Sequence, residues 1–227
     1  MKSKTRQRQK VAILLTSQPN FDEFALKYLI LSMNQVQSTY EFVFPEIEAR
    51  PYNEASYESD ALFASFPQVT QSIKFEGEPA YFINIIRPKF AGNLFFDCRE
   101  NIAFITTDVW QKRFAPPSVF DYLVHSIGST LIYMNSKLEL SSHTETRGCP
   151  LDYTRSKMDA RVDISLGYLC DDCKRAIADG AGAAYLEDIS KVIRGDWIGD
   201  VTTFDSVAHN LKRFFKFDIN KDSGFNK

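Results

Sequence analysis

Val11-Ala-Ile-Leu-Leu15 is a short continuous apolar run, the form expected of a β-strand that is covered on both faces. A helix start follows at Asn20-Phe-Asp-Glu23, where an asparagine cap precedes a glutamate by three residues, and apolar spacing carries this helix to about Val36. Tyr40-Glu-Phe-Val-Phe44 then alternates apolar and polar residues, as a half-buried strand does. The order β-α-β predicts an α/β fold in which a central mixed sheet is flanked by helices.

Three more elements are expected farther along the chain. Residues 81–86 and 101–106 have the apolar pattern of strands, and a short helix is expected around Tyr57 to Phe66. Pro116-Pro117-Ser118 is expected to open a helix that ends near Met134, because proline is tolerated in the first turn, where its missing N–H group costs nothing. These elements would extend the sheet and add helices that can cover it.

The last third of the chain differs in composition from the rest. Residues 141–172 are polar and rich in turn-forming residues. A final helix is expected to start at about Cys173 and to run through Val192, weakened at Gly180 and Gly182. Beyond it, residues 214–227 are expected to fray.

The composition is that of a globular chain without strong charge. Of its 227 residues, 44% are hydrophobic, which is enough to bury the core of one large domain. The net charge of −2 provides no global basic field that would favour nucleic acid. The first ten residues are nonetheless basic, through Lys2, Lys4, Arg6, Arg8 and Lys10, and we expect a solvated tail there.

No stretch of the sequence indicates a membrane or an export pathway. The apolar run at residues 11–15 is too short for a signal peptide, and no run approaches the roughly 20 apolar residues that span a membrane. Four cysteines without an export signal favour a reducing compartment, in which thiols bind metal instead of pairing. We therefore expect a cytoplasmic protein.

The clearest chemical pattern is His143-x5-Cys149-x20-Cys170-x2-Cys173. Zn²⁺ prefers four nitrogen or sulfur ligands in a tetrahedron, and three thiolates with one imidazole form such a closed shell. Cys173 is expected to open a helix, whose N-terminal dipole favours a thiolate. The pattern predicts one structural zinc ion bound by these four side chains.

The same cysteines allow two other interpretations. The four residues can be buried thiols beside an incidental histidine. The CxxC can also be a redox motif, but such motifs follow a strand in a βαβ unit, and residues 141–169 do not supply that context. Zinc is the interpretation that uses all four residues.

The helix expected to end near Met134 contains His125-Ser-Ile-Gly-Ser129. A zinc peptidase needs histidines four residues apart on one helical face and a glutamate after the first histidine as general base. Only the first histidine is present here, because Ser126 and Ser129 occupy the other two positions. The simplest role for His125 is a hydrogen bond to Asp121 one turn earlier. A nucleophilic pair of Cys98 with His125 has no supporting motif.

The order of these features resembles the archaemetzincins, a family of zinc peptidases with an α/β N-terminal part, an active-site helix and a cysteine cluster for a second, structural zinc. That cluster holds two cysteines, a methionine shortly after the second, and a CxxC farther on. His143 would replace its first cysteine and Leu151 its methionine. The similarity covers roughly residues 120–175 and implies a zincin-like scaffold that kept its structural metal and lost its peptidase centre.

This resemblance suggests four segments along the chain. They are a basic tail (1–10), an α/β zincin-like domain (11–140), a zinc-binding module packed on it (141–195), and a C-terminal helix and tail (196–227).

Three functions follow from these features. The leading hypothesis is a zinc-stabilised, non-catalytic binding or adaptor protein, a pseudoenzyme whose partner is another protein, because an intact cluster lies beside a broken catalytic helix. The alternative is an active metal-dependent hydrolase, a peptidase, that uses His125 with Asp121 or Asp108. The third is a nucleic-acid-binding zinc protein that uses the basic tail and residues 147–161.

Overall fold

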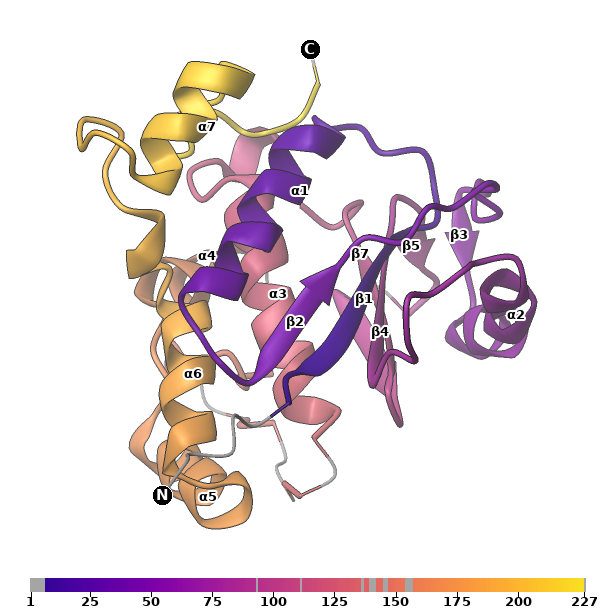
Figure 1. The fold of residues 1–227 in the computed structure, drawn as a ribbon, viewed down its shortest axis with the longest axis horizontal. Coiled ribbons are helices and arrows are strands. Elements are labelled where there is room, and N and C mark those ends of the chain that lie inside the picture. The colour runs from indigo at the N-terminus through magenta and orange to yellow at the C-terminus, as the bar shows by residue number, and fades with distance from the viewer. Residues whose placement is uncertain are drawn as a thin grey trace.

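The computed structural model of the chain describes residues 7–92, 94–110, 112–135, 137–138, 142–144, 147–153 and 157–226. These residues form α-helices around a five-stranded mixed sheet, with a two-stranded sheet at one side (Figure 1). The expected fold class, α/β with a central mixed sheet, is confirmed. None of the helices in these ranges is long and apolar enough to cross a membrane.

The five-stranded sheet has the order β2-β1-β4-β7-β6. Its first four strands are parallel, and β6 pairs with β7 in the antiparallel direction. In that order the strands are β2 (Tyr40–Val43), β1 (Gln9–Leu15), β4 (Tyr81–Ile86), β7 (Ile102–Thr106) and β6 (Phe96–Arg99). The strands expected at residues 40–44, 81–86 and 101–106 are all present, whereas β6 was not predicted.

Helices cover both faces of the sheet. Helix α2 (Ser59–Gln71) lies on one face beside the small sheet of β3 (Ser56–Tyr57) and β5 (Lys89–Phe90). Helices α1 (Glu23–Ser32) and α3 (Val119–Tyr133) lie on the other face (Figure 1). Of the C-terminal helices, α4 (Lys157–Leu166) and α6 (Ala183–Arg194) pack against α3, and α7 (Val207–Phe215) packs against α1. Helix α5 (Asp171–Ala181) packs against α6.

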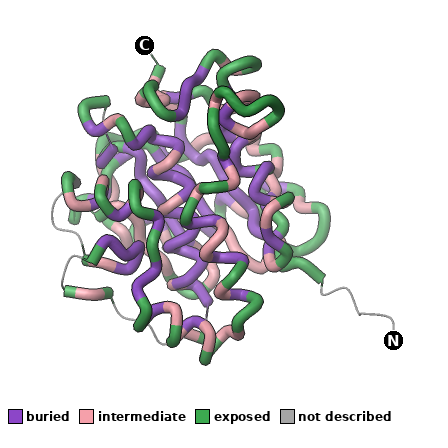
Figure 2. Tube along the Cα trace, turned by 90° about the vertical axis from the view of Figure 1, so that its left-hand side faces the viewer, coloured by how far each residue is buried: buried purple, intermediate pink, exposed green. Residues whose placement is uncertain are grey.

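Burial along β1 explains why its sequence is continuously apolar. Val11, Ile13 and Leu15 belong to the hydrophobic cluster on the α1 and α3 side, whereas Ala12 and Leu14 belong to the cluster under α2. Alternate side chains of a strand point to opposite faces, and both faces here are covered. The buried residues therefore run through the centre of the molecule, and the exposed residues lie on its outer turns (Figure 2).

Helix starts differ from the sequence expectation in their capping residue. Asp22 caps α1, with its carboxylate accepting from the backbone N–H groups of Phe24 and Ala25 at 2.9 and 3.0 Å, so the expected cap at Asn20 is wrong. Helix α2 is longer than expected and ends at residue 71. Ser118 caps α3. The two prolines before it therefore precede the helix instead of opening it.

The C-terminal third departs most from expectation. The single helix expected over residues 173–192 is two helices, because Gly182 adopts a backbone φ of 95° that ends α5 and begins α6. Helix α4 was not predicted at all. Gly167 follows it with a φ of 52°, and a Cβ there would lie 2.7 Å from the backbone of Arg194. The expected fraying end is wrong, since Phe217 and Ile219 are buried in the main core.

The proposed segment boundaries stay predictions, but the core crosses two of them. Cys149, Leu151 and Ile177 belong to the same hydrophobic cluster as β1 and α3. The strand β1 also begins at Gln9, inside the expected basic tail. Residues 1–6 of that tail, which hold Lys2, Lys4 and Arg6, lie outside the described residues.

Candidate metal centre

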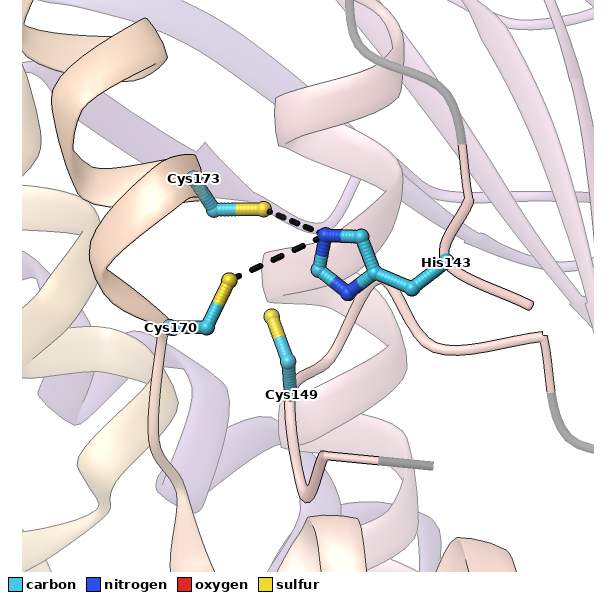
Figure 3. Close-up of side chains that lie close together, drawn as sticks. All are labelled: His143, Cys149, Cys170 and Cys173. Carbon is cyan, nitrogen blue, oxygen red and sulfur yellow. Dashed lines mark hydrogen bonds between the residues drawn. The ribbon is translucent and has the colours of Figure 1, made fainter. Parts of the chain in front are cut away.

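Four side chains from three separate stretches of chain meet beside helix α3. One ligand atom from each of His143, Cys149, Cys170 and Cys173 lies within 4.8 Å of the others. The three cysteines are buried, and the His143 side chain is 14% exposed. All three sulfur atoms point toward the imidazole ring (Figure 3). The structure thus brings together all four residues that the sequence pattern singled out.

Helix α5 positions the two cysteines of the CxxC. Cys170 is its N-cap residue, and Cys173 lies in its first turn, so both sulfurs project from the start of the helix. The amide of Lys174 donates to the carbonyl of Cys170 at 2.9 Å, which closes that turn. The positive end of the helix dipole favours negative charge on sulfur here.

The other two residues come from a paired loop. His143 forms an isolated parallel bridge with Asp152: the amide of His143 donates to the Leu151 carbonyl at 2.9 Å, and the amide of Tyr153 donates to the His143 carbonyl at 2.8 Å. Cys149 lies between them, and Gly148 before it has a φ of 77°. The loop thereby turns Cys149 back toward His143.

The spacing of the donor atoms fits a tetrahedral ion. Nε2 of His143 lies 3.1 Å from Sγ of Cys173 and 3.7 Å from Sγ of Cys170. A tetrahedron with Zn–S bonds of about 2.3 Å and a Zn–N bond of about 2.0 Å has S···N edges of about 3.5 Å. Buried thiols with one imidazole are also the donor set that soft or borderline metals prefer. The group can therefore hold a metal ion.

A carboxylate that the sequence pattern did not single out organises the loop. Asp152 Oδ1 lies 2.8 Å from Nδ1 of His143, while its Oδ2 accepts from the amides of Arg147 and Cys149. A carboxylate on the far nitrogen of a metal-binding imidazole fixes the ring and its tautomer, so that Nε2 is free to bind the ion. The only signal for Asp152 in the sequence is its place directly after Cys149-Pro-Leu151.

The close approach of the cysteine side chains shifts the pKa values of their thiols. The pKa of Cys149 is lowered to about 6, chiefly because Cys173 donates a hydrogen bond to its sulfur and because the amides of Cys170 and Leu151 also point at it. The same hydrogen bond, with burial, raises the pKa of Cys173. One thiolate is thus stabilised by its neighbours, and the remaining protons leave when a divalent cation binds the sulfurs.

The cluster is tied to helix α3. Ser129 Oγ donates to the carbonyl of His125 at 3.0 Å and contacts the carbonyl of Pro150 at 3.4 Å, so the residue after Cys149 packs on the helix. Cys149 and Leu151 are fully buried in the main core.

The fold of the chain has a counterpart among solved structures. The chain superimposes on the crystal structure of an archaemetzincin from Methanopyrus kandleri with a TM-score of 0.50 and 12% sequence identity, over 77% of this chain and 96% of that one. The fold is archaemetzincin-like. No family model and no curated protein sequence matches the chain.

His125 lies on α3 of this archaemetzincin-like fold, between two cavities that it helps to line. Burial lowers the pKa of its imidazole to about 4, and its Nε2 atom is buried without a hydrogen-bond partner. The expected hydrogen bond to Asp121 is wrong. The carboxylate of Asp121 instead accepts from the amide and the hydroxyl of Ser118, at 2.9 and 2.8 Å, and completes the capping box of α3.

Two other suggested partners of His125 lie elsewhere. Asp108 lines a cavity at the carboxyl ends of β1 and β4, which His125 does not line. Cys98 lies on β6 and lines neither of the two cavities beside His125. Burial raises its pKa, which disfavours the nucleophilic thiolate.

Replacing Asp152 should weaken the metal centre without removing a ligand. We expect Asp152→Asn to lower the affinity for Zn²⁺ about 10- to 100-fold, because the amide no longer holds the His143 ring as a carboxylate does. Competition with a chromogenic chelator measures this affinity. Asp172→Asn is the control, because Asp172 is exposed and pairs with Arg147 of the same loop at 3.0 Å. Equal affinities for the two variants would contradict the role given to Asp152.

The buried imidazole of His125 should make stability depend on pH. Its pKa is lowered on folding, so its contribution is present above the unfolded value of about 6.5 and is lost as the pH falls toward 4. Between pH 7 and 5 the wild type should lose about 2 kcal/mol more than His125→Gln. Urea unfolding with saturating Zn²⁺ at both pH values measures the difference. The same loss in both proteins would mean that the folded imidazole takes up a proton as readily as the unfolded one.

Proposed function

We propose that this chain is a zinc-stabilised, non-catalytic binding protein built on an archaemetzincin-like fold. The observation that carries the proposal is the state of helix α3. Ser126 and Ser129 occupy the positions at which a peptidase of this type needs its general base and second histidine, and both are buried. The hydroxyl of Ser129 is used to pack the helix against residues 149–152. A serine hydroxyl neither binds zinc nor removes a proton from water at neutral pH.

A structural role for the zinc is supported by the closed surroundings of its four candidate ligands. Catalytic zinc keeps an open position for water, whereas structural zinc is fully coordinated by protein atoms. Three cysteines and one histidine complete a tetrahedron, and the three sulfurs are buried. Within the described ranges, no second group of three or more histidine, cysteine or acidic side chains lies close enough together to hold an ion.

Binding of another protein is supported by an exposed apolar face on α4. Met158, Val162 and Leu166 recur every four residues and are 52%, 50% and 58% exposed, so they form one stripe along the helix. Tyr153 and Tyr168, which precede and follow α4 in the sequence, are also exposed. Contiguous apolar surface of this kind is typical of a protein interface. We therefore propose that the partner covers this stripe with an apolar surface of its own.

Of the basic residues between 147 and 161, the two with described side chains, Arg147 and Arg161, give little support to nucleic-acid binding. Arg147 forms an ion pair with Asp172 at 3.0 Å, and Arg161 donates to the carbonyl of Pro116 at 2.8 Å. A basic groove that tracks phosphates would instead present such cations to solvent.

The metal content of the chain tests the proposed role of the zinc. We expect one tightly held zinc ion per chain by native mass spectrometry, no change in His125→Ala, and loss of the ion with lower stability in Cys173→Ala. We also expect no cleavage of an unfolded protein substrate, even with added Zn²⁺. A second, exchangeable ion that disappears in His125→Ala, together with chelator-sensitive cleavage, would establish the hydrolase instead.

The partner surface is tested by site-specific photo-crosslinking in the cells that make the protein. A photoreactive amino acid at Val162 should give a discrete adduct with one protein, because this residue lies in the middle of the apolar stripe. The same amino acid at Arg175, which is 72% exposed on α5, is the control and should give none. Absence of an adduct at Val162, or the same adducts at both positions, would exclude α4 as the interface.

A further inference from the structure

A cavity of about 370 Å³ lies between α3, α4 and the segment before β6. Its walls are partly polar and partly apolar, and the apolar and aromatic part comes from Leu94, Phe95, Phe96, Tyr122 and Tyr133. A volume of this size suits a small organic molecule. The hydroxyl of Tyr122 already donates to the carbonyl of Thr106 at 2.8 Å, so this ring offers the cavity its apolar body.

Two polar atoms beside this cavity have no hydrogen-bond partner. They are Oδ1 of Asp163 on α4 and Nε2 of His125 on α3, and both side chains line the cavity. Asp163 is only 3% exposed. Buried polar atoms are nearly always hydrogen-bonded, and a buried carboxylate without a cation is especially costly. Two such atoms at one cavity therefore indicate that a ligand completes their bonding.

The charge of the cavity selects the class of ligand. Its described lining includes Asp152 and Asp163 but no lysine or arginine. Burial, with the negative charge of Asp152, raises the pKa of Asp163 to about 7, as expected for a carboxylate that lacks a cation. An ammonium group would supply that cation. The aromatic walls favour an apolar body next to it and also attract a cation.

We infer that this cavity binds a small organic amine, whose ammonium group donates to Asp163 Oδ1 and His125 Nε2 and whose apolar body packs between the aromatic walls. Burial keeps the His125 imidazole neutral at pH 7, so one of its nitrogens can accept. The inference uses the cavity and neither the apolar stripe of α4 nor the bound zinc. It therefore survives if the crosslinking experiment fails.

Three probes of the same shape test the charge preference. Phenethylamine, 2-phenylethanol and 3-phenylpropionate are titrated by calorimetry into the full zinc-loaded chain at pH 8, where Asp163 is mostly ionised and the amine is protonated. We expect saturable one-to-one binding of the amine and at least tenfold weaker binding of the alcohol and the acid. Equal binding of all three would reduce the cavity to a nonspecific apolar site and overturn the inference. Absence of saturable amine binding would overturn it as well.

Variants on α4 test the assigned contact. Asp163→Asn should weaken amine binding at least tenfold, whereas Asp159→Asn, one turn earlier and outside the described lining, should change it less than twofold. Without ligand, Asp163→Asn should melt no lower than the wild type, because it removes an unpaired buried charge. The amine should then raise the melting temperature of the wild type but not of Asp163→Asn. Unchanged affinity in Asp163→Asn, or a metal ion bound there in place of the amine, would refute the assignment.

Discussion

The meeting of three sulfur atoms with one imidazole nitrogen is the constraint on which the C-terminal third depends. His143 and Cys149 belong to an irregular loop, whereas Cys170 and Cys173 begin helix α5. Among the described residues, these stretches meet at the cluster and in the core beneath it. Without a bound cation, bringing three buried thiols and an imidazole together would add little to the stability of the fold. A cation bound by all four would stabilise their close approach, and metal binding and folding would then be coupled.

Helix α3 connects this cluster to the rest of the molecule. It lies buried between the sheet and the C-terminal helices, and Ser129 contacts the chain at Pro150. In a peptidase the same position must project a metal ligand into a solvent-accessible cleft. Here the hydroxyl of Ser129 donates to the backbone carbonyls of His125 and Pro150. His125 lines a cavity together with Asp163. The helix thus links the sheet, the cysteine cluster and this cavity within an archaemetzincin-like fold.

Several features followed from local sequence because local physics decides them. The continuous apolar run of β1 predicted a strand buried on both faces, and its neighbours do cover both faces. The spacing of one histidine and three cysteines predicted a site, because few other arrangements use all four side chains. The prediction of the N-cap of α1 failed because two nearby residues can serve as caps. Asp22 and Asn20 are both favourable N-cap residues, and the structure uses Asp22, whose carboxylate accepts from two backbone amides.

The sequence by itself determined the α/β class, the position of four strands and the identity of the four clustered side chains, because periodicity and ligand chemistry depend on local residue types. The tertiary structure alone decided the position of Asp152 behind His143, the break at Gly182 and the existence of α4. It also decided that Asp163 and His125 share one cavity. These features depend on which segments pack together. Helix α4 has a polar sequence in which Met158, Val162 and Leu166 face outward. The periodicity of the sequence therefore does not predict α4, because the burial of that helix depends on the segments that pack against it.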